Sequence, residues 1–471
     1  MADSFLIWFL IVLPLIGSLF VLSAKDDAPF YQNTLNVSLL TLTVNVCLVL
    51  IAFSKLSLIP SHEIIVTWTF LPSLNLSFGA DVMSLIFILG LQISILIGIL
   101  GIKAEQTSSK NLLFHTLLYT SILNGYFLAR DILSFYVCFA GMLWPFYMLT
   151  LAGISDVKYK ILERVMMHYF LSAALFLASL MMIVSLTQNN VLIFNLPEVI
   201  FSHKKSMIVW GALFMALVLR VPVWPFHHAI ITLSNSLKNP LVFIALHILP
   251  LSGIYAFMRF WPLDIPYEIE VLSPLFQGLC ILTMIFAAFG GYAHSGAGQK
   301  LYHYIFVYDL LYLSAVFLPT DAISFNITYS IFSFMLISSG LVMLQAHMLT
   351  ESSKFNIGVK GILCYMPRTS LAYALFVLAA IGLPISAFFS NNFIIVSQMF
   401  DFGLYIGTLV VISITIASVS MLENLYTLRV ENCILPQPDT IKDITPSKFA
   451  ILVALMMILL FSLIKPLWFV L

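Results

Sequence analysis

The segment from Ala216 to His228, ALVLRVPVWPFHH, places an arginine, two prolines three residues apart and two adjacent histidines inside an apolar run. Pro222 and Pro225 each remove a backbone hydrogen bond from a helix, and in lipid the freed groups must be satisfied by protein or water. Arg220 at this depth costs roughly 2.5–3.5 kcal/mol on insertion scales. The segment predicts a broken helix that lines a polar path. A kinked helix with an interfacial arginine is the alternative, but about a dozen apolar residues precede the charge.

Other polar side chains in apolar segments could belong to the same path. His227 and His228 could titrate near neutral pH, or they could hydrogen-bond the backbone at the break. Asp309 could carry protons or pair with a basic group, and we favour proton transfer. His247 is a further candidate, although we expect an interior histidine whose hydrogen bonds are satisfied. Glu423, late in the apolar segment 402–424, could face a cytoplasmic vestibule.

The composition indicates a polytopic membrane protein. Of 471 residues, 61% are hydrophobic and only 9% are charged, whereas soluble proteins carry about 25% charged residues. The net charge is zero, which suggests no nucleic-acid partner. The five cysteines are scattered, so we expect no metal site, no iron–sulfur cluster and no disulfide framework.

Apolar segments of about 18–25 residues can span a bilayer as helices. The chain holds fourteen of them, which predicts an all-α fold: 5–22, 33–53, 82–102, 112–129, 131–151, 165–187, 206–231, 237–258, 271–290, 302–318, 323–346, 370–389, 402–424 and 448–470. The first segment lacks a basic flank and a clear cleavage site, so we expect a retained helix rather than a signal peptide.

The loops predict the orientation of these spans. Connections after odd-numbered spans carry 14 lysines and arginines, and connections after even-numbered spans carry 5. Because cytoplasmic loops are enriched in these residues, both termini are expected on the non-cytoplasmic side.

The spacing of the helix breaks predicts an internal repeat. Pro384, in IGLPISAFF, follows Pro222 by 162 residues. The same offset carries the start of the fourth span close to the ninth, and the start of the eighth close to the thirteenth. Two inverted five-helix repeats, spans 4–8 and 9–13 with broken helices 7 and 12, fit this spacing. The expected division is 1–111, 112–258 for the first repeat, 271–424 for the second, and 425–471.

Four motifs carry a family resemblance: FGADVMSL (78–85), GYFLARDILSFYVCFAGMLWPFYML (125–149), RVPVWPFH (220–227) and GLP (382–384). Together they resemble the antiporter-like, proton-translocating subunits of respiratory NADH:quinone oxidoreductase (complex I), above all the subunit M type. The wider family includes subunits of multisubunit cation/proton antiporters and membrane-bound hydrogenases. The resemblance covers about residues 78–395. It implies fourteen helices with two inverted repeats, a bacterial inner-membrane location, other membrane subunits as partners, and no cofactor in this chain.

The resemblance also shows which family relay groups are absent. The family's helix 5 glutamate falls on Ala140, its helix 8 lysine on Leu251, its helix 11 histidine on Phe334, and its helix 12 acid on Asn392. A buried lysine can release its proton because burial lowers its pKa. Arginine stays charged, and Arg220 stands in place of the helix 7 lysine. Water or carbonyls freed at the break are candidate partners for its charge.

Among the other family positions, the helix 7 histidine is kept as His227, and a helix 10 histidine is replaced by Asp309. Arg220, His227, His228 and Asp309 are therefore expected to line what remains of a path for protons or monovalent cations. The chain would contribute to proton translocation coupled to electron transport, without catalytic chemistry of its own. The alternatives are an antiporter-complex subunit, a degenerate structural paralogue that conducts nothing, and, least favoured, an independent solute transporter.

Overall fold

The computed structural model describes residues 2–23, 28–56, 64–71, 74–102, 109–153, 159–187, 193, 206–234, 237, 239–261, 273–294, 296–318, 323–354, 361–384, 386–429 and 441–461. The chain divides into two compact units. Unit 1 comprises 1–96, 103–233 and 245–278, and unit 2 comprises 97–102, 234–244 and 279–471.

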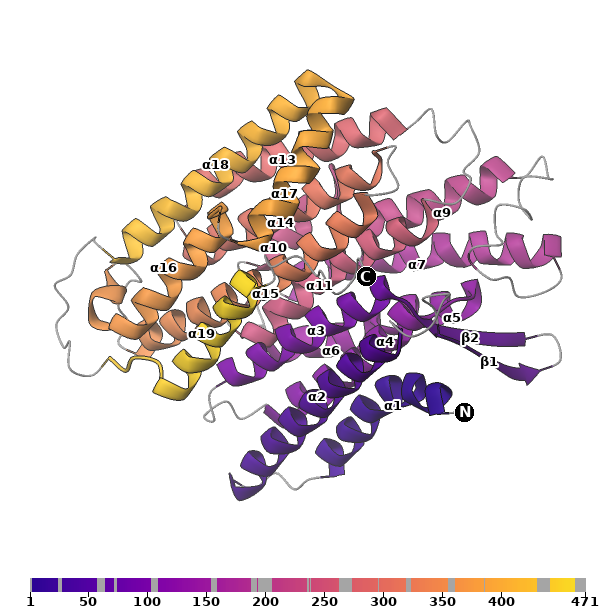
Figure 1. The fold of residues 1–471 in the computed structure, drawn as a ribbon, viewed down its shortest axis with the longest axis horizontal. Helices are drawn as coiled ribbons and strands as arrows, with labels where there is room; N and C mark the ends of the chain where they lie inside the picture. Colours follow the sequence, from indigo (N-terminus) through magenta and orange to yellow (C-terminus); the bar gives the residue numbers. More distant parts are fainter. Residues whose placement is uncertain are drawn as a thin grey trace. The chain divides into compact units, whose positions relative to one another are not determined.

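Long helices and one hairpin build unit 1 (Figure 1). The elements of its continuous part are α1 (Ala2–Ser23), α2 (Ala28–Leu56), β1 (Ile64–Leu71), β2 (Leu74–Ala80), α4 (Ser109–Leu128), α5 (Ile132–Gly141), α6 (Leu143–Gly153), α7 (Tyr159–Thr187), α9 (Ser206–Arg220) and α10 (His227–Ser234). Helices α3 (Val82–Gly101) and α11 (Pro240–Phe260) contribute residues to both units.

Helices are the only regular elements among the described residues of unit 2. Its elements are α13 (Ser273–Ala293), whose first turns are counted with unit 1, α14 (Ala297–Val316), α15 (Ile323–Lys354), the short 3-10 helix η3 (Ile362–Tyr365), α16 (Pro367–Ile381), α17 (Ala387–Phe402), α18 (Leu404–Arg429) and α19 (Pro446–Phe461).

The prediction of a helical, polytopic membrane protein is confirmed. Within the described residues, nine helices are long and apolar enough to cross a membrane, and three shorter apolar helices accompany them. The number of fourteen spans stays a prediction. The structure adds the antiparallel β1–β2 hairpin within the stretch 54–81, which was expected to be a connection only. It also joins Cys364 in a disulfide, contrary to the expectation drawn from cysteine spacing.

The predicted span 131–151 is not one continuous helix. Helix α5 ends at Gly141 and α6 begins at Leu143. Pro145, in the first turn of α6, has no N–H for the carbonyl four residues back, and its ring clashes with that carbonyl. A helix that begins just before a proline avoids both problems. The break was missed because hydropathy alone does not register it.

Both predicted breaks at proline are confirmed. Helix α9 ends at Arg220 and α10 begins at His227, after a turn that contains Pro222 and Pro225. Helix α16 ends at Ile381, and Gly382 takes a left-handed conformation with φ 96°, which glycine adopts without a steric penalty. Helix α17 then begins at Ala387 and continues to Phe402, well beyond the predicted end at 389.

The helix boundaries support the predicted repeat. Helices α4 and α13 begin at Ser109 and Ser273, α7 and α15 at Tyr159 and Ile323, and α11 and α18 at Pro240 and Leu404. Each pair of starting residues is 164 residues apart. The broken helices α9/α10 and α16/α17 occupy the same place in the two series. The division at 112–258 and 271–424, and the inverted relation of its halves, stay predictions.

An ion-pair cluster fixes the base of the hairpin in unit 1. The carboxylate of Asp81, which follows β2, accepts hydrogen bonds from both amino groups of Arg259 at 2.7 Å and lies 3.4 Å from Arg130. Burial alone would raise the pKa of Asp81, but Arg259 and then Arg130 hold it well below its usual range. Asp131 caps α5 by accepting from Ser134 N at 2.8 Å. Arg130 and Asp131, which lie at the boundary of the predicted spans 112–129 and 131–151, are therefore buried structural groups.

Candidate functional site

Arg220 is the most deeply buried charge of unit 1, with 0% of its surface exposed. Its Nε donates to Ser252 Oγ on α11 at 3.2 Å, and its Nη2 donates to the carbonyl of Phe139 on α5 at 3.2 Å. No carboxylate of the described residues lies within 4.0 Å of the guanidinium. The expected partners were water or carbonyls freed by Pro222, whereas the observed partners come from two other helices.

Aromatic rings cover the faces of this guanidinium. Its Cζ lies 4.2 Å from the ring centroid of Phe139 and 5.4 Å from that of Tyr169 on α7. Such contacts contribute up to about 2 kcal/mol when they are desolvated. Nη1 has no hydrogen-bond partner within the described residues. The arginine is thus held by two hydrogen bonds and a ring face instead of by an acid.

The Phe139 carbonyl is available because α5 ends two residues later. Carbonyls in the last turn of a helix lose the partners that a continuing helix supplies. They also form the negative end of the helix dipole, where a cation is favoured. Arg220 therefore has a backbone acceptor at the end of α5, next to Ala140, where a family glutamate was expected to be absent.

Helix α11 is shaped to admit the arginine. A Cβ on Gly253 would lie 2.6 Å from a methyl carbon of Val221 and 2.9 Å from Cγ of Arg220. Neighbouring Ser252 donates its own hydroxyl proton to Leu249 O at 2.6 Å and accepts a bond from Tyr126 at its carbonyl. Only a residue without a side chain allows α9 and α11 to approach this closely.

The other predicted groups of unit 1 differ in exposure. His227 is partly buried at the start of α10, whereas His228 beside it is exposed on the surface of the chain. Pro222 is buried and Pro225 is exposed. His247 and Leu251 are buried on α11. The part of these histidines in a path stays a prediction.

In unit 2, Asp309 lies on α14 with 1% of its surface exposed, and its intramembrane position stays a prediction. One turn further along, Tyr312 OH lies 3.4 Å from Ser330 Oγ on α15. Ser330 donates to Asn392 Oδ1 on α17 at 2.6 Å. Asn392, expected at the position of an acidic family residue, is thus part of a neutral hydrogen-bonded group that links three helices.

Phe334, the position of a family histidine, is the centre of an aromatic cluster. Its ring centroid lies 5.2 Å from that of Tyr308, 5.8 Å from that of Tyr312 and 5.8 Å from that of Phe388. These rings pack together between α14, α15 and α17, and the loss of a family histidine at Phe334 stays a prediction.

Glu423 forms an ion pair that the sequence did not predict. Its Oε2 lies 2.8 Å from Nζ of Lys300, and the side chains are 45% and 4% exposed respectively. Glu423 therefore neutralises a nearly buried lysine at the start of α14. The sequence did not indicate this ion pair, because Lys300 was assigned to the connection between the predicted spans 271–290 and 302–318.

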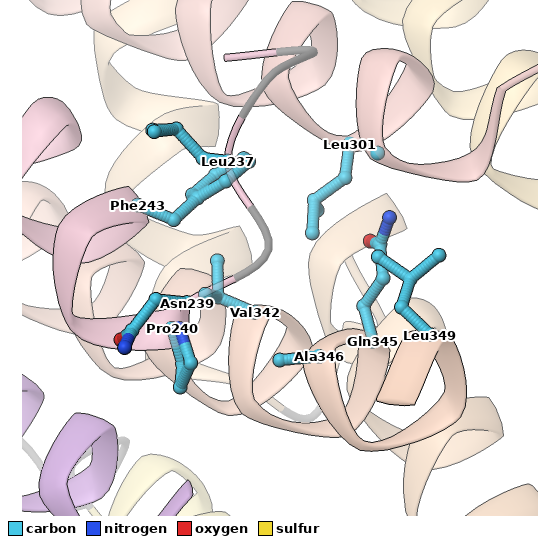
Figure 2. Close-up of a pocket in the computed structure, with 10 residues that line it drawn as sticks. Leu237, Asn239, Pro240, Phe243, Leu301, Val342, Gln345, Ala346 and Leu349 are labelled. Atoms are coloured by element: carbon cyan, nitrogen blue, oxygen red, sulfur yellow. The ribbon is translucent and has the colours of Figure 1, made fainter. Parts of the chain in front are cut away.

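Unit 2 also contains a small cavity near the start of α11 (Figure 2). Its volume of about 20 Å³ has room for about one water molecule. Figure 2 shows Gln345 and Ala346 of α15, Leu301 of α14 and Asn239 around it. The cavity is far too small for an organic cofactor. Within the described residues no group of His, Cys, Asp and Glu could hold a metal ion.

The chain matches the family profile described as NADH:quinone oxidoreductase/Mrp antiporter, transmembrane, over residues 129–417. It is 25% identical to subunit M of the NADH-quinone oxidoreductase of Rickettsia conorii over 434 residues, which cover 88% of this chain and 86% of that protein. It is 23% identical to NADH-ubiquinone oxidoreductase chain 4 of Mycosarcoma maydis, covering 83% and 82% of the two chains.

Solved structures show the same fold. A chain of respiratory complex I from Thermus thermophilus superimposes with a TM-score of 0.84 at 19% identity, covering 98% of this chain and 96% of that one. A chain of the Mrp complex from Dietzia superimposes with a TM-score of 0.82 at 16% identity, covering 98% and 94%. At these identities the likeness concerns the fold alone.

Proposed function

We propose that this chain, which belongs to the NADH:quinone oxidoreductase/Mrp antiporter family of membrane proteins, is an integral subunit of a multisubunit proton-translocating complex. The proposed complex is an NADH:quinone oxidoreductase in which this chain is the subunit M-like component. The observation that carries the proposal is the family match over residues 129–417, which includes both broken helices. Relatives of subunit M type, matched over 86% of their length, support the choice of complex.

A subunit of a monovalent cation/proton antiporter complex is the second candidate. The TM-scores of 0.84 and 0.82 for the two kinds of complex do not separate them. The named relatives of subunit M and chain 4 type favour the respiratory complex.

The contribution of this chain to transport is proposed to be small or absent. Arg220 keeps its charge, and Phe334 stands within packed rings. Leu251 and Asn392 add no titratable group. A relay that lacks these groups has no series of sites along which a proton can pass. One specific alternative is therefore a degenerate paralogue that conducts no protons. The other is a chain that still conducts protons by a rerouted path through Asp309 and His227.

The proposed setting is a bacterial inner membrane with both termini on the non-cytoplasmic side. The loop bias of 14 against 5 supports this orientation. The proposed partners are the other membrane subunits of the complex, and the transported species are protons or monovalent cations. Cofactors and redox chemistry are assigned to partner subunits.

Proton uptake driven by NADH in inverted membrane vesicles tests the proposal. Vesicles that lack this chain should lose NADH-driven proton uptake, because the complex is then incomplete. Wild-type chain supplied in trans should restore the uptake. Unaltered NADH oxidation and uptake without the chain would contradict membership of this complex.

Asp309→Asn combined with His227→Phe separates the two views of conduction. If the assembled double variant moves as many protons per NADH as wild type, the chain has a structural role. A large loss of pumping with assembly intact would instead establish the rerouted path.

A further inference from the structure

We propose that the carboxyl-terminal end of α5 is the counter-charge of Arg220, and that this arginine is a permanent clamp of the α9 break rather than a group that exchanges protons. The inference rests on the proposed function only for its transport measurement. The clamp itself is argued from contacts within unit 1.

The first argument is the location of the acceptor. Nη2 of Arg220 bonds the carbonyl of Phe139, three residues before the Met142 cap of α5. This carbonyl lies in the last turn of α5, just before the break that separates α5 from α6. It cannot accept a proton at any ordinary pH, so its attraction for the arginine does not change during turnover. A carboxylate at Ala140 would behave differently because it can be neutralised by protonation.

The second argument is that two helix breaks meet at one side chain. Arg220 is the last residue of α9, before the turn that contains Pro222, and its acceptor lies where Pro145 separates α5 from α6. Each break frees backbone groups in a buried region. The guanidinium joins the two breaks and also bonds Ser252, so three helices are tied at one point.

The third argument is the shape of the guanidinium. Nε and Nη2 are separate donors in a rigid plane, and they address acceptors on different helices while the plane covers the Phe139 ring. A lysine has one compact ammonium group and cannot reproduce this arrangement. The residue therefore acts as a positioning group for the break, and only arginine meets all three contacts.

Two matched pairs of variants test the clamp in the intact complex. Ser252→Ala removes the acceptor of Nε, whereas Ser179→Ala removes a buried hydroxyl that bonds only its own helix, to Phe176 O. Gly253→Ala pushes a methyl group into Val221 and Arg220, whereas a Cβ at Gly211, on α9, meets nothing within 4 Å. We expect Ser252→Ala and Gly253→Ala to lower the temperature at which the chain dissociates from its complex. Ser179→Ala should leave that temperature unchanged, and Gly211→Ala should leave it unchanged or raise it slightly.

Arg220→Lys and Arg220→Met test whether Arg220 takes part in proton transfer. Loss of its structural contacts alone should not change proton translocation in complexes that remain intact. The number of protons translocated per NADH, counted only for intact complexes, should equal the wild-type value in both variants. Lysine should rescue stability only in part. A lower proton ratio in Arg220→Met with unchanged stability would overturn the proposal, as would equal stability within each matched pair.

The outcomes distinguish the clamp from the proposed function. If no NADH-linked proton uptake depends on this chain, the proposed function fails. The dissociation or unfolding temperatures of the matched pairs still decide the clamp. If Ser252→Ala behaves like Ser179→Ala, the clamp fails, whatever complex the chain belongs to.

Discussion

Asp443, three residues before α19, secures the start of α16. Its Oδ2 accepts from Arg368 N at 2.8 Å, and its Oδ1 accepts from Thr369 N at 3.0 Å and from the Thr369 hydroxyl at 2.6 Å. Burial raises the pKa of Asp443, but the Thr369 hydroxyl and then the backbone N–H groups lower it further, so the net shift is below its ordinary value. The ionised form is therefore the one that the folded state prefers.

Asp443→Ala should lower the stability of the chain at neutral pH by about 1 kcal/mol, since an anion at a helix start contributes roughly that amount. Because the folded-state pKa is depressed, this stability is present above the unfolded-state pKa and is lost as the pH falls through the folded-state value. Thermal unfolding in detergent should show a difference between variant and wild type at pH 7 that disappears in strong acid. A difference independent of pH would refute this role of the carboxylate.

At the residue scale, the sequence predicted the burial of Arg220 but not what surrounds it. Every residue has a carbonyl, so no side-chain type marks Phe139 as an acceptor 81 positions away. The Lys300–Glu423 pair was missed for the same reason, since pairing across helices depends on how they pack. Conversely, Asp309 was placed correctly inside the protein because its apolar neighbours along the chain are visible in the sequence.

At the scale of elements, proline and glycine were more informative than hydropathy. The breaks after Arg220 and Ile381 were predicted because prolines lie inside apolar runs. The break at Met142 was missed, since Pro145 occupies a first-turn position that a helix tolerates and the apolar run continues across it. The β1–β2 hairpin was missed because it lies outside any membrane-length segment.

Gly340 on α15 marks a close helix contact that can be tested directly. A Cβ there would lie 2.3 Å from the ring of Phe376 on α16, which is itself fully buried. Gly340→Ala should therefore destabilise the chain by roughly 1–3 kcal/mol, as overpacking in a filled interior does. Unfolding midpoints in detergent provide the measurement.

Gly278→Ala is the matched control, because a Cβ there meets nothing within 4 Å. Alanine favours a helix over glycine by roughly 0.5–1 kcal/mol, so this control should be neutral or slightly stabilising. Equal destabilisation by both substitutions would show that the α15–α16 approach is not as close as the structure indicates.

At the scale of the whole molecule, length and internal spacing predicted more than any single motif. The 164-residue offset between helix starts was foreshadowed by the prolines 162 residues apart. The orientation in the membrane cannot be predicted from this spacing, because it depends on the charges in the loops and not on the helices themselves.

The orientation predicts which loops react with a membrane-impermeant thiol reagent. A cysteine at Lys360 should be labelled only from the cytoplasmic side and a cysteine at Lys205 only from the opposite side, in a chain whose native cysteines have been replaced. Both positions lie outside the described residues, and the prediction rests on the loop charges alone. The reverse pattern would refute the orientation.

Recovery of the tagged chain from native membranes in mild detergent tests the central claim most directly. The described residues of this chain form helices and one hairpin, and we expect the chain to be recovered with other membrane subunits. Mass spectrometry should identify those of an NADH:quinone oxidoreductase, and the preparation should oxidise NADH. Recovery of a stable single chain that moves protons or cations by itself in liposomes would contradict the account.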